Sequence, residues 1–232
     1  MSRSDLAAAA AALSPRIGVR LEATPRLAEA LTHPSASSPA RPDNQRLEFL
    51  GDRVLGLVIA QELIARFPGE PEGVLAPRLN ALVRKETCAE AAAGIGLGAH
   101  LRLGRSEAIG GGRRKTAILG DAMEALIAAV YLDQGMEAAR AVILHAWGPR
   151  LAAAADAPRD AKTHLQEWAQ ARGWAPPVYE VVDRAGPDHA PVFTVEARMA
   201  DGLGARASAR SKRAAQQSAA AALLARVEKD DE

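Results

Sequence analysis

Aromatic residues are scarce in this sequence, since Phe, Trp and Tyr together make up 3% of its 232 residues. Hydrophobic residues nevertheless account for 48% of the chain. A core can therefore form, but it must be built from leucine, valine, isoleucine and alanine. Because leucine and alanine are strong helix formers, this composition favours helices.

Cysteine, net charge and long apolar runs are limited as well. Cys88 is the only cysteine, so no intrachain disulfide can form, which suits the reducing cytoplasm. The formal net charge is +1, so any nucleic-acid surface must be a local patch of charge. No apolar run in the sequence approaches the roughly 20 residues of a membrane-spanning helix. We interpret the alanine-rich residues 1–13 as a helix rather than a signal peptide, and expect a cytoplasmic protein without a membrane partner.

The most informative stretch is residues 43–52, Asp-Asn-Gln-Arg-Leu-Glu-Phe-Leu-Gly-Asp. Apolar residues recur at helical spacing along and after it, which predicts a helix with one buried face. Glu48 and Asp52 are four residues apart, so they share a face, with Cβ atoms roughly 5–6 Å apart. Two carboxylates this close repel each other, and a proton or a metal ion relieves the repulsion. The alternative is that Glu48 only pairs with a surface cation such as Arg46 or Arg53.

A second acidic pair lies in the apolar stretch 117–127. Asp121 and Glu124 are three residues apart and share one face of the predicted helix. Charged side chains are rarely buried unless they are paired or bound to a metal. Two helices that each bring an acidic pair to an apolar interface predict an oxygen-rich site for a hard cation. Mg²⁺ or Mn²⁺ fits such a site better than zinc or copper.

The stretch 44–52 closely resembles the signature of bacterial ribonuclease III. Three further segments match the same family in its order, so the similarity covers nearly the whole chain: 31–35, 111–115 and 120–126. The resemblance implies a Mg²⁺-dependent endoribonuclease, with Mn²⁺ as a possible substitute, that hydrolyses double-stranded RNA. The implied products carry 5′-phosphates and short 3′ overhangs. The implied substrates are ribosomal RNA precursors and other structured transcripts, including mRNA and tRNA precursors.

The family's functional acids have counterparts in this chain. The resemblance implies that Glu48, Asp121 and Glu124 bind magnesium, and that Asp52 and Glu124 are catalytic acids. Glu72 matches a further acidic position of the family. Its place in a loop after a proline is equally typical of an ordinary surface residue.

Gln45 departs from the family pattern, because many members have glutamate at this position. It lies three residues before Glu48 and should share its helical face. An amide can hydrogen-bond but brings no charge to a cation. Any metal role of this position is therefore in doubt, while the four carboxylates remain complete.

Phe49 lies between two of these acids. A large aromatic residue at such a position is most often part of the core. The resemblance implies instead that Phe49 helps to form a homodimer interface in which the signature helices of two subunits face each other. Such a dimer would set two acidic sites along one groove and allow cleavage of both strands of a duplex.

The loop 110–116 combines glycines with basic residues and ends in Lys-Thr. It lacks the spacing of a phosphate-binding P-loop and follows no predicted strand, so we expect no nucleotide cofactor. Arg113 and Arg114 more plausibly contact RNA phosphates. A solvated run of charge is the alternative.

The composition of the chain changes near residue 155. Before it we expect only helices, at about 4–13, 25–31, 44–67, 75–93, 115–132 and 136–154. After it we expect a helix, three strands and a helix, at about 161–172, 178–184, 192–199, 204–210 and 212–227. The second set resembles a double-stranded-RNA-binding domain. We therefore predict a multidomain protein with an all-α endonuclease domain (1–154), a linker (155–160) and a small α+β binding domain (161–228).

The resemblance also implies which residues of the second domain bind RNA. Lys212 and Arg213 match a phosphate clamp at the start of the last helix, where the helix dipole favours anions. Ala214 stands where a third basic residue is common. Minor-groove contacts are implied for Thr163, Gln166, Glu167 and His189, although an exposed loop histidine needs no such role. Such domains read A-form shape over roughly 16 base pairs.

Two other functions compete with this prediction. A duplex-RNA-binding protein without catalysis has no reason to hold four carboxylates near a polyanion. A helical di-iron carboxylate protein typically uses Glu-x-x-His ligands, and neither acidic helix contains that motif.

Overall fold

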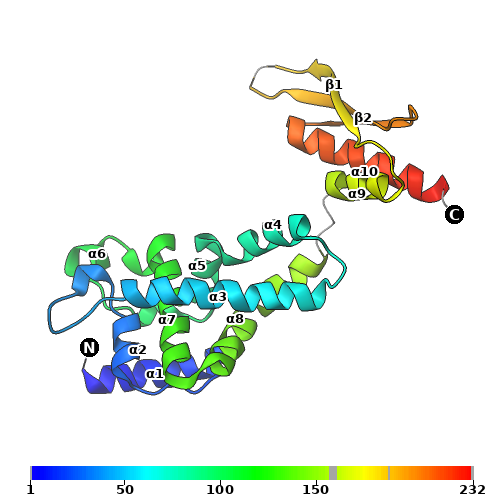
Figure 1. The fold of residues 1–232 in the computed structure, drawn as a ribbon. Coiled ribbons are helices and arrows are strands. Elements are labelled where there is room, and N and C mark those ends of the chain that lie inside the picture. The colour runs from blue at the N-terminus through cyan, green and yellow to red at the C-terminus, as the bar shows by residue number, and fades with distance from the viewer. Residues whose placement is uncertain (1, 157–160, 188, 231–232) are drawn as a thin grey trace. The chain divides into compact units, whose positions relative to one another are not determined.

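The computed structural model describes residues 2–156, 161–187 and 189–230, without the side chains of 154–156 and 228–230. The chain divides into two compact units, Met1–Asp156 and Ala157–Glu232. Figure 1 shows helices in the first unit and a small sheet with two helices in the second. Residues 157–160 of the predicted linker and Asp188 of the predicted RNA-binding loop lie outside the described residues.

The described part of the first unit consists of helices and the loops between them. The α-helices are α1 (Arg3–Ile17), α2 (Pro25–Ala30), α3 (Gln45–Arg66), α4 (Glu72–Val83), α5 (Lys85–Gly94), α6 (Arg105–Ile109), α7 (Thr116–Gln134) and α8 (Met136–Asp156). The short 3₁₀ turns are η1 (Pro34–Ala36), η2 (Leu97–His100) and η3 (Gly112–Arg114). Helix α7 is apolar around its circumference, and α2, α3, α5 and α8 pack against it. It is therefore the central helix of this unit.

Helix α1 begins earlier and ends later than predicted. Ser2 caps it, because its hydroxyl accepts a hydrogen bond from the Asp5 N–H while the Asp5 carboxylate accepts one from Ser2. Pro15 lies inside the helix instead of ending it, and Gly18 with φ of 71° forms the end. A proline removes only one backbone donor, and the buried apolar residues on either side of it hold the last turn in the core.

The single helix predicted at 75–93 is wrong, because the structure has two helices there. Helix α4 ends at Val83, Arg84 is extended with φ of −63° and ψ of 154°, and α5 begins at Lys85. No glycine or proline lies at the break. Local sequence signals therefore could not have located it.

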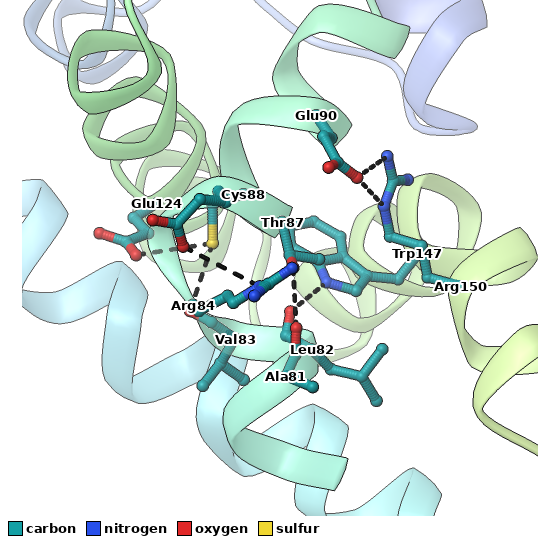
Figure 2. Close-up of polar contacts among 11 residues, drawn as sticks. Ala81, Leu82, Val83, Arg84, Thr87, Cys88, Glu90, Glu124, Trp147 and Arg150 are labelled. Carbon is teal, nitrogen blue, oxygen red and sulfur yellow. Dashed lines mark hydrogen bonds and ion pairs between the residues drawn. The ribbon is translucent and has the colours of Figure 1, made fainter. Parts of the chain in front are cut away.

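Side chains from the first turn of α5 and from α8 contact the carbonyls that the break releases (Figure 2). The Thr87 hydroxyl donates to the Ala81 carbonyl at 2.7 Å. The Trp147 indole Nε1 donates to the Leu82 carbonyl at 2.8 Å. The Cys88 thiol lies 3.5 Å from the Val83 carbonyl. Buried carbonyls need such partners, so both the neighbouring turn and a tertiary hydrogen bond from Trp147 stabilise the end of α4.

Helices α3 and α7 cross at very short range. A Cβ atom built on Gly51 would lie 1.8 Å from the Glu124 carbonyl oxygen. Only glycine fits at such a contact. The crossing brings the acidic face of α3 against the acidic face of α7.

The second unit contains α9 (Ala161–Ala171), β1 (Val178–Ala185), β2 (Val192–Arg198), β3 (Gly204–Ala209) and α10 (Lys212–Asp230). The strands form an antiparallel sheet in the order β1-β2-β3. Val195 and Ala197 of β2 are buried while Arg198 is exposed, as the alternation predicts. Helix α10 packs on α9, β2 and β3, and these elements share a core of their own. The predicted fold class, an all-α unit followed by an α-β-β-β-α unit, is confirmed.

None of the described helices combines the length and the apolar character that a membrane crossing requires.

Candidate functional site

Three carboxylates from two helices meet at the crossing of α3 and α7. Glu48 of α3 and Asp121 and Glu124 of α7 each offer an oxygen atom, and these atoms all lie within 4.8 Å of one another. We call these three side chains the carboxylate cluster. Asp52 lines the same pocket as Glu48 and Glu124, which has a volume of about 400 Å³. Its carboxylate forms an ion pair with Arg53 and is not a member of the cluster.

Burial and repulsion within the cluster disfavour the charged forms of Glu48 and Glu124. Glu124 is only 6% exposed. The pKa of Glu124 is raised to about 7, mainly by burial and secondly by the negative charge of Glu48. Burial and the charge of Asp121 also raise the pKa of Glu48. A cation would stabilise the charged forms of all three side chains.

The raised pKa of Glu124 predicts how pH affects the metal-free protein. Because the folded protein holds this proton up to about pH 7, whereas the ordinary pKa is 4.5, the folded state binds more protons than the unfolded state between these values. Glu124 should therefore lower the free energy of unfolding as pH rises through this window, by at most about 1.4 kcal/mol per pH unit. Denaturant titrations in EDTA between pH 4.5 and 8 measure the effect. The Glu124→Gln protein should show a smaller fall, and identical pH profiles would contradict the assignment.

Two residues that no sequence pattern assigned to the site, Lys85 and Cys88, contact the cluster. Lys85 Nζ lies 2.6 Å from Asp121 Oδ1, and this contact is the main cause that raises the pKa of Lys85. The Cys88 thiol donates to Glu124 Oε1 across 3.6 Å, as Figure 2 shows. Both lie 36 residues from their partners, on a helix whose start depends on the unpredicted break at Arg84. No spacing rule could have identified them.

The cluster fits a hard divalent cation. Asp121 Oδ1 is buried, and the ammonium of Lys85 is its ion-pair partner among the described residues. The three side chains supply only oxygen donors, as Mg²⁺ and Mn²⁺ prefer. Three carboxylates within 4.8 Å of one another, with one ammonium beside them, carry a net negative charge that suits a divalent cation.

Comparison with known families accounts for both units. Residues 25–151 match the family model described as Ribonuclease-III-like. Residues 161–227 match the double-stranded RNA binding motif. The chain belongs to the ribonuclease III family.

Relatives of this ribonuclease III family member match along nearly their whole length. Ribonuclease 3 of Cereibacter sphaeroides (strain ATCC 17025) is 62% identical over 221 residues, which cover 95% of this chain and 96% of the relative. Ribonuclease 3 of Rhodobacter capsulatus is 57% identical over 224 residues, which cover 97% and 98%. The crystal structure of the nuclease domain of ribonuclease III from Campylobacter jejuni is 34% identical, with a TM-score of 0.57, and covers 60% of this chain and 94% of that one.

Membership in the ribonuclease III family makes this chain an endoribonuclease, and its second unit makes double-stranded RNA its partner. The competing hypotheses of a binding protein without catalysis and of a di-iron protein are therefore wrong. The carboxylate cluster is consistent with a divalent metal.

The predicted RNA-binding residues of the second unit lie at three places. Lys212 and Arg213 are exposed in the first turn of α10, where Lys212 Nζ lies 5.6 Å from the centre of the Phe193 ring. His189 is exposed between β1 and β2. The remaining three are half-buried or exposed on α9: Thr163, Gln166 and Glu167.

In the first unit, Arg113 donates hydrogen bonds to the carbonyls of Gly98 and Ala99, each at 2.9 Å, and so joins its loop to η2. Arg114 is exposed beside it. Glu72 is exposed at the start of α4 and is not part of the carboxylate cluster.

Two residues of the signature stretch lie beside the acids. Gln45 lines the pocket together with Glu48 and Asp52. Phe49 is 69% exposed. The alternative that Phe49 belongs to the core of its own chain is therefore wrong.

Proposed function

We propose that this endoribonuclease hydrolyses double-stranded RNA with Mg²⁺, for which Mn²⁺ can substitute. The carboxylate cluster carries the proposal, because it gathers three oxygen ligands within 4.8 Å on two crossing helices. Glu48, Asp121 and Glu124 would hold the ion. When bound, the ion would polarise a phosphoryl oxygen and lower the pKa of a water molecule.

The side chains around the cluster would complete the catalytic site. Asp52 faces the same pocket and pairs with Arg53, and in this proposal it accepts a proton or orients the attacking water. Glu124 both binds metal and acts as a catalytic acid in this proposal. Gln45, which lines the pocket, can hydrogen-bond water or RNA but adds no charge.

The proposed products are RNA fragments with 5′-phosphates and short 3′ overhangs, and the proposed substrates are precursors of ribosomal RNA and other structured transcripts of the cytoplasm. Recognition by shape supports a range of duplex substrates. The second unit has an α+β fold of the kind that reads A-form geometry with little sequence preference.

RNA binding would use both units. In the second unit, the exposed Lys212 and Arg213 would contact phosphates, since the start of α10 already favours anions. Minor-groove contacts would come from the residues on α9 and in the β1–β2 loop: Thr163, Gln166, Glu167 and His189. In the first unit, Arg114 would contact phosphates near the site. Arg113 would do so through the guanidinium hydrogens that do not bind the carbonyls of Gly98 and Ala99.

A homodimer would align two such sites. Helix α3 carries an exposed apolar stripe of Phe49, Leu57 and Ile64, which are 69%, 48% and 62% exposed. The spacing of eight and seven residues keeps them on one face. Large apolar side chains that share a face mark an interaction surface. A solved relative, the Campylobacter jejuni nuclease domain, is described as having a region involved in dimer formation.

Charge in the apolar stripe should disrupt the dimer. Leu57→Glu would bury a carboxylate in the interface without a partner, so we expect the dimer to weaken at least about tenfold, which corresponds to about 1.4 kcal/mol. Sedimentation velocity over a concentration series measures this. Ile109→Glu, at a residue that is 77% exposed on a different helix, is the matched control and should leave the dimer intact. If the Leu57→Glu protein dimerised as strongly as wild type, the dimer interface would not include the apolar stripe of α3.

Cleavage of a duplex RNA of roughly 30 base pairs, longer than the roughly 16 that one binding domain spans, tests the proposed reaction. We expect cutting with Mg²⁺ or Mn²⁺, no cutting with EDTA, and recovery when Mg²⁺ is added back, since the acids alone cannot neutralise the phosphate charge. A single-stranded RNA of the same sequence should remain uncut. A protein that binds the duplex tightly but cuts it with neither metal would contradict the proposal and would point first to Gln45.

A further inference from the structure

Lys85 places a positive charge at the carboxylate cluster. It is the first residue of α5, and its Nζ lies 2.6 Å from Asp121 Oδ1. The side chain also lines the pocket that contains Glu48 and Glu124. Among the described residues, Lys85 is the only basic residue in an ion pair with a member of the cluster.

The backbone, and not only a flexible side chain, sets this position. The extended Arg84 ends α4 and starts α5 directly beside α7. There, Lys85 packs on Gly120, the residue before Asp121. A Cβ atom built on Gly120 would lie 2.9 Å from Lys85 Cγ and 3.1 Å from the Lys85 carbonyl oxygen. The absence of a side chain at Gly120 therefore lets the lysine stem lie on α7 and reach Asp121.

The contact is nevertheless able to open. The side chain of Lys85 is 47% exposed, whereas that of Asp121 is 23% exposed. The ammonium can therefore swing into solvent while the carboxylate stays in place. A half-exposed lysine regains its hydration when it leaves the carboxylate, so a competing cation can displace it.

We propose that Lys85 is a tethered counter-cation of the carboxylate cluster, which neutralises it when no metal is bound and leaves Asp121 when a divalent cation enters. This inference rests on the proposed metal-dependent function of the same site. An ammonium and a divalent cation cannot share one carboxylate oxygen without strong repulsion. Lys85 would therefore stabilise the metal-free fold, lower the affinity for metal, and set the metal concentration at which the enzyme becomes active.

Calorimetric titration of the full chain with Mn²⁺ tests the competition without any measurement of activity. We expect Lys85→Met to bind Mn²⁺ about tenfold more tightly than the wild-type protein, because the competing charge is gone. Lys85→Arg keeps the charge and should bind like wild type. Arg84→Met is the matched control, since it removes one positive charge from the adjacent residue, whose ion pair is with Glu86.

Thermal melting in EDTA supplies a second readout. Lys85→Met should melt at a lower temperature than wild type, because the cluster loses its counter-cation, and Mn²⁺ should raise its melting temperature by more than it raises that of wild type. Arg84→Met should show neither change. An unchanged circular-dichroism spectrum below the melting transition would establish that the helices of the first unit are folded in each variant.

Three results would overturn the inference. Lys85→Met protein that binds Mn²⁺ no more tightly than wild type would show that the lysine does not compete with metal. An equal gain in Arg84→Met protein would show a general effect of net charge. Wild-type protein that binds no Mn²⁺ would contradict the metal site itself, and so both the proposed function and this inference. In the first two cases the metal site would remain.

Discussion

The Glu124→Gln protein should bind duplex RNA but cut it at least about 10³-fold more slowly than wild type. Glutamine keeps the shape of the side chain but removes the charge from the most buried member of the carboxylate cluster, which is 6% exposed. A metal at such a site supplies several kcal/mol of transition-state stabilisation, and each 1.36 kcal/mol is a factor of ten in rate. Single-turnover cleavage and a filter-binding assay separate the two effects.

Glu90→Gln is the matched control for this prediction. Glu90 is an exposed carboxylate on α5 that pairs with Arg150 and lies away from Glu124 in Figure 2. The chemical change is identical, so its cleavage rate should stay within about twofold of wild type, because a surface ion pair contributes little. Wild-type cleavage by Glu124→Gln protein would refute the catalytic assignment. A joint loss of binding and cleavage would indicate a damaged fold.

The Gly51→Ala protein should lose at least about 2–3 kcal/mol of stability, together with its metal site. The added methyl group would lie 1.8 Å from the Glu124 carbonyl oxygen, and a backbone atom cannot move aside as a side chain can. Helices α3 and α7 would have to separate, and overpacking of this kind is strongly destabilising. The separation would also pull Glu48 away from Asp121 and Glu124, so Mn²⁺ affinity should fall. Denaturant unfolding and calorimetry measure the two losses.

Gly94→Ala is the control for the glycine substitution. Gly94 is also helical, and a Cβ atom there would meet no other atom within 4 Å. Alanine is a better helix former than glycine by about 1 kcal/mol in a helix interior, so this change should be neutral or slightly stabilising. A Gly51→Ala protein as stable as wild type would contradict the close contact between α3 and α7 at this position.

The sequence predicted the acids of the site because helical spacing is a local property. Glu48 and Asp52 had to share a face of one helix, and Asp121 and Glu124 a face of another, whatever the rest of the chain did. The structure brings Glu48, Asp121 and Glu124 together as a cluster. Asp52 reaches only the same pocket and pairs with Arg53. Spacing thus identified candidates, while the orientation of each carboxylate depended on its neighbours in space.

Two local predictions failed for a common reason. Pro15 was expected to end α1, and residues 75–93 were expected to form one helix. In both cases packing overrode the local signal. Buried residues keep α1 helical through the proline, and side-chain donors from Thr87 and Trp147 replace helical hydrogen bonds at the end of α4.

By itself, the sequence determined which residues could carry the chemistry, that the first unit is helical, and that the second contains a helix, three strands and a helix. These properties follow from periodicity and composition, which act over a few residues. Only the tertiary structure decided that α3 and α7 touch at Gly51, that α4 ends at Val83, and that Lys85 and Cys88 reach the acids. Most of the partners in these contacts are distant in sequence, among them Trp147 at the end of α4, and only the packed core brings them within bonding distance.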